Sequence, residues 1–165
     1  MEKEDIMENK NDKIKVYIAA GWFDEFQEKA LEYIENLLFN NDKFEVYSPR
    51  KEDLLESGSI HEKEVRQRVF QANVKNIKDA DLLITSTVGK DMGTIFESGY
   101  ANAAKIPIIY TLFDERLGEN VVFNLMLSES GIACFTNKQE FENFIDKITK
   151  ENVSTIKQDY EGAIE

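Results

Sequence analysis

The sequence has one cysteine and one histidine among its 165 residues. Cys134 alone allows no intramolecular disulfide, and its apolar surroundings at residues 131–135 favour a small buried side chain over a nucleophile. The single histidine, His61, excludes most histidine-based metal sites, and leaves a Ser-His triad only if it is the base. Its polar neighbours favour a surface position. We therefore expect neither a disulfide framework nor a resident metal ion.

Long apolar runs and an excess of positive charge are also missing. No apolar run approaches the roughly 18 residues of a membrane span, and residues 1–15 have no signal-peptide core. The net charge of −12 argues against polymeric nucleic acid as a partner, because such binding requires Lys and Arg to neutralise phosphates. We expect a cytoplasmic protein that contacts neither membranes nor nucleic acid polymers.

The organisation of the chain is that of one domain. Residues 1–12 are charged and poor in apolar side chains, which predicts a flexible N-terminal tail. Residues 13–165 are enough for one domain that buries about two-thirds of its unfolded surface. No internal repeat and no second domain is evident.

Short apolar segments alternate with amphipathic ones after the tail. The predicted strands are residues 15–20, 44–47, 81–87, 106–111 and 132–136. The predicted helices are residues 26–38, 65–77, 93–105 and 141–148. This alternation predicts an α/β three-layer sandwich of the flavodoxin-like class, with a parallel sheet in the order 2-1-3-4-5. Ligands of such sheets bind beyond the carboxyl ends of the strands, near the switch between strands one and three.

Two carboxylates, Asp91 and Glu97, fall at this expected site. The helix neighbours of Glu97 are small, which leaves room for a ligand; they are Gly93, Ala101 and Ala104. The alternative is a solvated glutamate favoured by the helix dipole. Asp91 is either the N-cap of the helix or a carboxyl group that contacts or protonates a leaving group. The stripe that we expect to pack on the sheet is Met92, Ile95, Phe96, Gly99, Tyr100 and Ala103.

The loop after the first strand adds a possible ligand surface. Gly21 allows a close approach to the backbone, but the loop lacks the glycine patterns of dinucleotide or triphosphate sites. Trp22 and Phe23 are either platforms for a nucleobase or packing anchors. Tyr17, within the strand, is a core residue whose hydroxyl needs a partner.

These segments together resemble the nucleoside 2′-deoxyribosyltransferase family. The similarity runs from about residue 13 to the end of the chain. Its five pieces, in the family's order and spacing, are residues 16–23, 77–81, 91–101, 124–126 and 160–163. Each piece alone is weak, and five in order are specific.

The resemblance implies an enzyme of nucleoside salvage that transfers 2′-deoxyribose between purine or pyrimidine bases without a cofactor. Glu97 resembles the nucleophile that attacks C1′ to give a covalent deoxyribosyl-enzyme, so that a second attack retains configuration. Tyr17 resembles the tyrosine that orients this glutamate. Asp91 resembles the aspartate that contacts the base and helps it leave protonated.

The resemblance also implies a homo-oligomer with shared sites, commonly a hexamer built from dimers. Asn124 resembles the asparagine that binds the sugar's 5′-hydroxyl in a neighbouring subunit. Met126 belongs to the same segment and is assigned to substrate binding. The Glu165 carboxylate falls where the family's C-terminal carboxylate joins the site, provided that no residue follows it.

Two departures from the family concern the base. Asn73 stands where the family usually has a second aspartate, and an amide hydrogen-bonds a base edge without supplying a proton. Asp53 stands where some members use a glutamine to hold the base. Together they leave the preference between purine and pyrimidine open.

Two other functions fit parts of the sequence. Related enzymes of this fold hydrolyse deoxynucleosides or their 5′-monophosphates, and Ser48, Arg50 and Ser86 are the candidate phosphate ligands. A non-catalytic nucleotide sensor is the other alternative, because a fold alone does not determine function.

Overall fold

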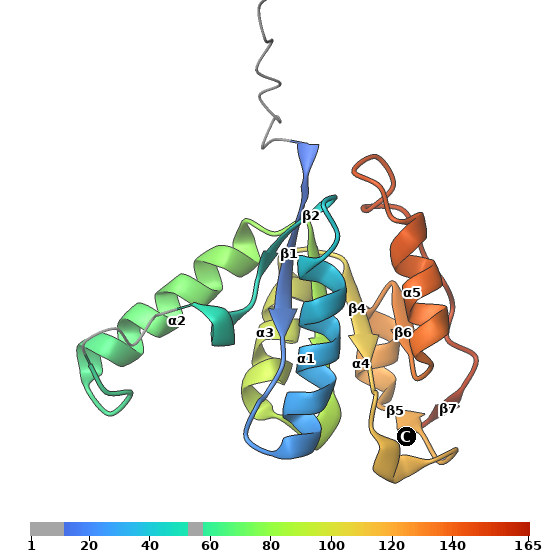
Figure 1. The fold of residues 1–165 in the computed structure, drawn as a ribbon, viewed down its shortest axis with the longest axis horizontal. Coiled ribbons are helices and arrows are strands. Elements are labelled where there is room, and N and C mark those ends of the chain that lie inside the picture. The colour runs from blue at the N-terminus through green and yellow to red at the C-terminus, as the bar shows by residue number, and fades with distance from the viewer. Residues whose placement is uncertain (1–11, 53–57) are drawn as a thin grey trace, which may run out of the picture.

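The computed structural model describes residues 12–52 and 58–165. Its centre is a sheet of five parallel strands in the order β2-β1-β3-β4-β6 (Figure 1). The strands are β1 Ile14–Ala19, β2 Phe44–Tyr47, β3 Leu82–Ser86, β4 Ile108–Thr111 and β6 Ala133–Phe135. Counted within this sheet, the order is the predicted 2-1-3-4-5, and the flavodoxin-like fold is confirmed. Asp53 and almost all of the expected tail lie outside the described residues.

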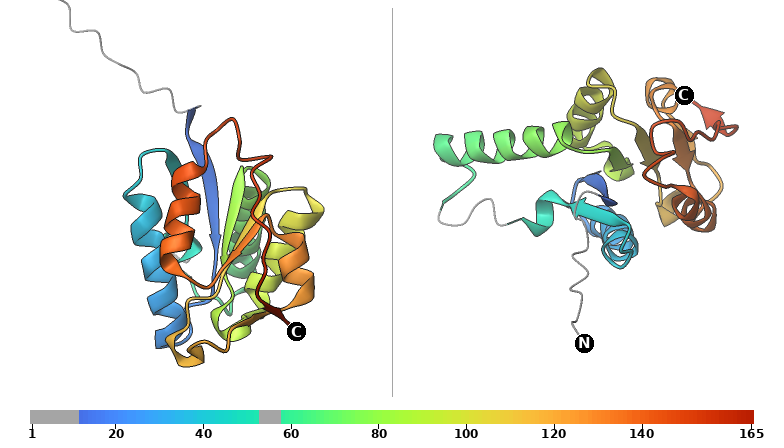
Figure 2. Two further views of the ribbon diagram at one scale, coloured as in Figure 1. Left: turned by 90° about the vertical axis from the view of Figure 1, so that its right-hand side faces the viewer. Right: turned by 90° about the horizontal axis from the view of Figure 1, so that it is seen from above.

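Helices cover both faces of the sheet, which explains why its strands are apolar runs rather than alternating ones. One face carries α1 Glu25–Phe39 and α5 Lys138–Lys147. The other face carries α2 Lys63–Lys78, α3 Met92–Ala103 and α4 Leu125–Ser130 (Figure 2). β3 and β4 are buried along their whole length. None of the described helices combines the length and the apolar character of a membrane span.

Short elements that the sequence pattern does not predict complete the fold. β5 Val122–Phe123 pairs in parallel with β7 Ala163–Ile164, and α4 follows β5 directly. The backbone of Glu165 donates to the Phe123 carbonyl at 3.0 Å and accepts from the Leu125 N–H at 3.1 Å. These bonds fix the end of the chain beside the carboxyl end of the sheet. 3₁₀ turns also form at η2 Pro49–Lys51, η3 Val88–Lys90 and η4 Glu115–Leu117.

The predicted packing face of α3 is wrong. Met92 is 86% exposed and Phe96 is 53% exposed. The buried residues of the helix are instead Thr94, Ser98 and Ala101. Their small size lets α3 lie close to the sheet, and the Ser98 hydroxyl is satisfied by the Thr94 carbonyl at 2.9 Å and lies 3.3 Å from the Thr85 hydroxyl. Glu97, three residues after Thr94 and four before Ala101, therefore borders the buried face.

Candidate active site

Two loops meet at the carboxyl ends of β1 and β3. Buried Gln27 holds them together, because its Nε2 donates to the Val88 carbonyl at 3.1 Å and its Oε1 accepts from the Phe23 N–H at 2.8 Å. A Cβ atom on Gly21 would lie 2.9 Å from Gln27 Nε2 and 3.1 Å from Asp91 Cβ. The absence of a side chain at Gly21 therefore allows the first loop to pack against Asp91.

Tyr17 and Glu97 form the centre of the site. Tyr17 is fully buried in β1, and its hydroxyl donates a hydrogen bond to Oε2 of the half-buried Glu97. Burial raises the pKa of Glu97 to about 7. The Tyr17 hydrogen bond acts in the opposite direction and lowers this pKa, whereas the charge of Asp91 raises it further. Burial, and then the charge of Glu97, raise the pKa of Tyr17 above its ordinary value. Near neutral pH, a neutral phenol thus faces a carboxyl group that titrates.

Asp91 caps α3, as the sequence allows. Its Oδ2 accepts from the backbone N–H and from the hydroxyl of Thr94, each at 2.8 Å. Among the described residues no hydrogen bond reaches Oδ1, so this oxygen is available to a ligand. Capping and ligand contact are therefore compatible in one side chain.

A second tyrosine, which the sequence analysis missed, extends the site toward α2. Tyr47 is the register partner of Tyr17 in the β1–β2 ladder, and the two rings stack at 5.4 Å between centroids and 19° between planes. The Tyr47 hydroxyl lies 3.4 Å from Oδ1 of Asn73 on α2 and donates to it. Burial, then the charges of Glu52 and Glu97, raise the pKa of Tyr47. A continuous row of side chains thus links Glu97 to Asn73.

Aromatic side chains line the rim of the first loop. Trp22 is 38% exposed and Phe23 is 80% exposed, and their rings are nearly parallel at 6.2 Å. The packing alternative therefore fails for Phe23 within this chain. An exposed flat surface beside Gly21 is suited to stacking on a nucleobase.

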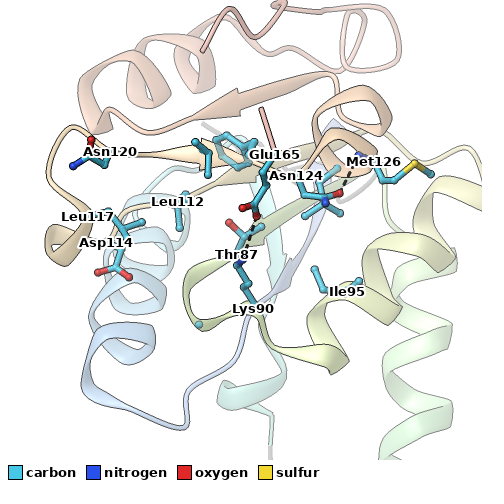
Figure 3. A pocket seen from close by; sticks show the side chains of 14 residues that line it. Thr87, Lys90, Ile95, Leu112, Asp114, Leu117, Asn120, Asn124, Met126 and Glu165 are labelled. Carbon is cyan, nitrogen blue, oxygen red and sulfur yellow. Dashed lines mark hydrogen bonds and ion pairs between the residues drawn. The ribbon is translucent and has the colours of Figure 1, made fainter. Parts of the chain in front are cut away.

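A cavity of about 690 Å³ lies at the carboxyl ends of β3 and β4. Asn124, Met126 and Glu165 line it, but Tyr17, Asp91 and Glu97 do not (Figure 3). The Asn124 side chain caps α4 by accepting from the Met126 N–H at 2.9 Å. Lys90 Nζ, which also lines the cavity, lies 3.1 Å from a Glu165 side-chain oxygen. The predicted site residues therefore fall into two groups that do not share a cavity within one chain.

Of the three candidate phosphate ligands, Ser48 and Arg50 already bind one carboxylate of the chain. Ser48 and Ser86 are buried. The Ser48 hydroxyl donates to Glu35 Oε1 at 2.6 Å, and the Arg50 guanidinium donates to both oxygens of the same carboxylate. Neutralised in this way, Arg50 offers little to a 5′-phosphate.

Neither Cys134 nor His61 belongs to the site. Cys134 is buried, as predicted, and burial raises the pKa of its thiol to about 12. His61 is exposed. Residues 12–52 and 58–165 contain no cluster of three or more His, Cys, Asp or Glu side chains able to hold a metal ion.

Comparisons with known proteins show the family and the fold of the chain. A family model described as nucleoside 2-deoxyribosyltransferase matches residues 16–144. A solved 2-deoxyribosyltransferase from Bacillus psychrosaccharolyticus is 25% identical, with a TM-score of 0.72 over 88% of this chain and 99% of its own. No curated protein matches the sequence.

Two further solved structures share the fold. A conserved protein from Enterococcus faecalis V583 is 20% identical, with a TM-score of 0.62 over 82% of this chain and 98% of its own. The CMP N-glycosidase BcmB from Clostridium botulinum is 19% identical, with a TM-score of 0.54 over 80% of this chain and 98% of its own. At these identities the likeness concerns the fold alone.

Proposed function

This chain belongs to the nucleoside 2-deoxyribosyltransferase family, and we propose that it transfers 2′-deoxyribose from one nucleobase to another through a covalent intermediate on Glu97. The observation that carries the proposal is the hydrogen bond from buried Tyr17 to Glu97 Oε2 at the carboxyl ends of β1 and β3. It fixes one carboxylate oxygen and leaves Oε1 without a hydrogen bond from any described residue. Oε1 is then the oxygen that attacks.

The reaction proceeds in two displacements. In the first, Glu97 Oε1 forms a bond to C1′ as the bond from C1′ to the base nitrogen breaks, and the leaving base takes up a proton from solvent that is passed to it through the Asp91 carboxylate. In the second, a nitrogen of the incoming base attacks C1′, Glu97 leaves as a carboxylate, and Asp91 takes up the proton of the incoming base. Two inversions at C1′ retain its configuration.

The charges around the site favour nucleosides over their 5′-monophosphates. A phosphate needs an unpaired cation or free N–H groups, whereas Arg50 is paired with Glu35 and the hydroxyl of Ser48 is turned to the same carboxylate. We therefore assign the substrates as 2′-deoxyribonucleosides and free bases.

A neighbouring copy of the chain is part of the proposal. Asn124, Met126 and Glu165 line a cavity that excludes Glu97, which supports their action in the site of an adjacent subunit. The outer side of α2 and α3 also exposes large apolar side chains, since Phe70 is 56% exposed and lies 6.0 Å from the ring of Phe96. Burying such a patch favours association. We propose a homo-oligomer built from dimers.

The proposal is tested by incubating the protein with deoxyinosine and adenine and measuring deoxyadenosine and free deoxyribose. We expect deoxyadenosine to form faster than free sugar. A hydrolase would release deoxyribose whether or not adenine is present, and a sensor would release neither. Glu97→Ala, assayed in parallel, is expected to form neither product.

A further inference from the structure

We propose that Glu35 is a positioning residue of the site: it anchors the turn after β2, so that Tyr47 holds Tyr17 against Glu97. The inference rests on the proposed role of Glu97. Glu35 lies on α1, which covers the face of the sheet opposite to α3. It contacts neither Tyr17 nor Glu97 directly, so its effect is transmitted through β2.

Glu35 is a buried carboxylate whose partners, within the part of the chain that the structure describes, come from one short stretch. Its side chain is 2% exposed. The Ser48 hydroxyl donates to Oε1 at 2.6 Å, Arg50 Nε donates to Oε1 at 3.3 Å, and Arg50 Nη2 donates to Oε2. Lys51 Nζ lies farther away, at 3.9 Å, and its side chain is 55% exposed. Charge-assisted bonds of this two-nitrogen kind fix direction as well as distance.

The anchored stretch begins one residue after Tyr47. β2 is an edge strand of the five-stranded sheet, in which its only neighbour is β1 (Figure 1). On its outer side, the last residue of β2 is held by the hydrogen bond from the Tyr47 hydroxyl to Asn73 on α2 and by contacts beyond the end of the strand. The Glu35 cluster supplies them at Ser48 and Arg50, immediately after the residue that stacks on Tyr17.

The row of contacts then continues to the reacting group. The rings of Tyr47 and Tyr17 lie 5.4 Å apart, and Tyr17 donates to Glu97 Oε2. The titratable groups that shift the pKa of Glu97 are Tyr17 from β1 and Asp91 from the loop before α3. Burial, then the charges of Glu52 and Glu97, raise the pKa of Tyr47 on β2. Because the Tyr17 hydrogen bond favours the ionised form of Glu97, any loosening of Tyr17 raises the Glu97 pKa. That pKa therefore reports on the Glu35 anchor.

The test replaces the ion pair as a unit. In E35M/R50M no charge is left buried without a partner, and such replacements by apolar residues of similar size are often neutral for stability. K51M is the matched control, because it removes one positive charge from the same turn but not the buried anchor. Thermal unfolding shows whether each variant folds. If E35M/R50M does not fold, R50K replaces it, since lysine keeps the charge but not the two-nitrogen contact.

The primary readout does not depend on activity. The titration of Glu97 is followed by NMR on protein labelled with ¹³C at the glutamate side-chain carboxyl groups, and E97Q assigns the signal. We expect the pH midpoint of the Glu97 titration to rise in E35M/R50M and in Y17F, and to stay unchanged in K51M. In the combined variant Y17F/E35M/R50M, the midpoint should be no higher than in Y17F alone. An unchanged midpoint in folded E35M/R50M overturns the proposal. An equal further rise in the Y17F background also overturns it, because the effect would not pass through Tyr17.

Kinetics supply the second readout. A misplacement of about 1 Å costs on the order of 10²-fold in rate, so we expect kcat of E35M/R50M for transfer to fall roughly 10- to 100-fold with KM little changed. If Glu97 of the wild-type protein titrates as expected but the protein turns over no nucleoside, the proposed function is contradicted. The NMR result on Glu35 would still stand, because it does not depend on activity.

Discussion

The hydroxyl of Tyr17 on β1 donates a hydrogen bond to the Glu97 carboxylate on α3. The two residues act on each other in opposite senses. Burial raises the pKa of Glu97 and the tyrosine hydrogen bond lowers it. Burial, and then the charge of Glu97, raise the pKa of Tyr17 and keep its hydroxyl a donor. The result is a carboxylate that is held by one oxygen and ionises near neutral pH.

The first prediction concerns the pH dependence of catalysis. A nucleophilic Glu97 must be ionised. We therefore expect kcat/KM to rise with pH through a midpoint near 7, which is the pKa of the Glu97 carboxyl group in the free enzyme. In Y17F the midpoint should move to higher pH, because the hydrogen bond that favours the carboxylate is gone. Y33F is the matched control, since Tyr33 donates to Glu142 at 2.8 Å in a comparable pair that includes neither Tyr17 nor Glu97. Equal profiles for Y17F and Y33F would contradict the orientation assigned to Tyr17.

The second prediction separates the two functions of Asp91. Asn is as good an N-cap as Asp, so D91N should unfold at nearly the wild-type temperature. It cannot protonate a leaving base, and we expect kcat to fall by roughly 10²- to 10⁴-fold. Because the charge of Asp91 raises the Glu97 pKa, the pH midpoint should also move down, opposite to Y17F. D24N, at the N-cap of α1, controls for the change of cap, and a D91N enzyme as active as D24N would exclude the acid role.

A third prediction links Glu97 to stability. Its pKa is raised from 4.5 to about 7 in the folded protein, so the folded state binds this proton more tightly than the unfolded chain does. The free energy of unfolding therefore falls as pH rises through this interval. E97Q should be as stable as wild type at pH 4 and more stable at pH 8, by up to about 3 kcal/mol at about 1.4 kcal/mol per pKa unit. Chemical denaturation at both pH values measures the free energy of unfolding, with the exposed-site variant E119Q as the control for lost charge. An E97Q variant stabilised equally at both pH values would contradict the raised pKa of Glu97.

The fourth prediction concerns the base. Asn73 accepts from Tyr47 at 3.4 Å, and an aspartate there keeps this acceptor while adding a group that can carry a proton. We expect N73D to raise kcat/KM for transfer and to change its ranking among deoxyadenosine, deoxyinosine, deoxycytidine and thymidine donors. N76D, one turn further along α2, is the control. An unchanged ranking in N73D would separate Asn73 from base recognition.

The sheet could be predicted from the sequence because each strand is a short apolar run and each long helix carries its own periodicity. The face of α3 that packs on the sheet could not be predicted in this way. Thr94 and Ser98 are polar in any hydropathy pattern, yet they are buried, because their small side chains and satisfied hydroxyls allow close packing on β3. The large apolar residues Met92 and Phe96 remain outside. β5 and β7, with two residues each, are too short for any periodicity.

The site was predictable to a similar extent. Tyr17, Asp91 and Glu97 belong to local motifs at strand and helix ends, and the structure brings them to one place. Tyr47 and Gln27 act through partners that are remote in sequence, Tyr17 and Val88, and no local pattern marks them. The β1–β2 register, which pairs Tyr17 with Tyr47, is the signal that could have revealed Tyr47.

The most direct test of the account is to trap the intermediate. The protein is incubated with a slow 2′-fluoro-2′-deoxynucleoside in the absence of an acceptor base, digested, and examined by mass spectrometry. The account predicts one added 2-fluoro-2-deoxyribosyl group, on the peptide that contains Glu97 and localised to that residue, which disappears when adenine is added. An active enzyme that carries no adduct, or carries it on another residue, would contradict the assignment of Glu97 as the nucleophile.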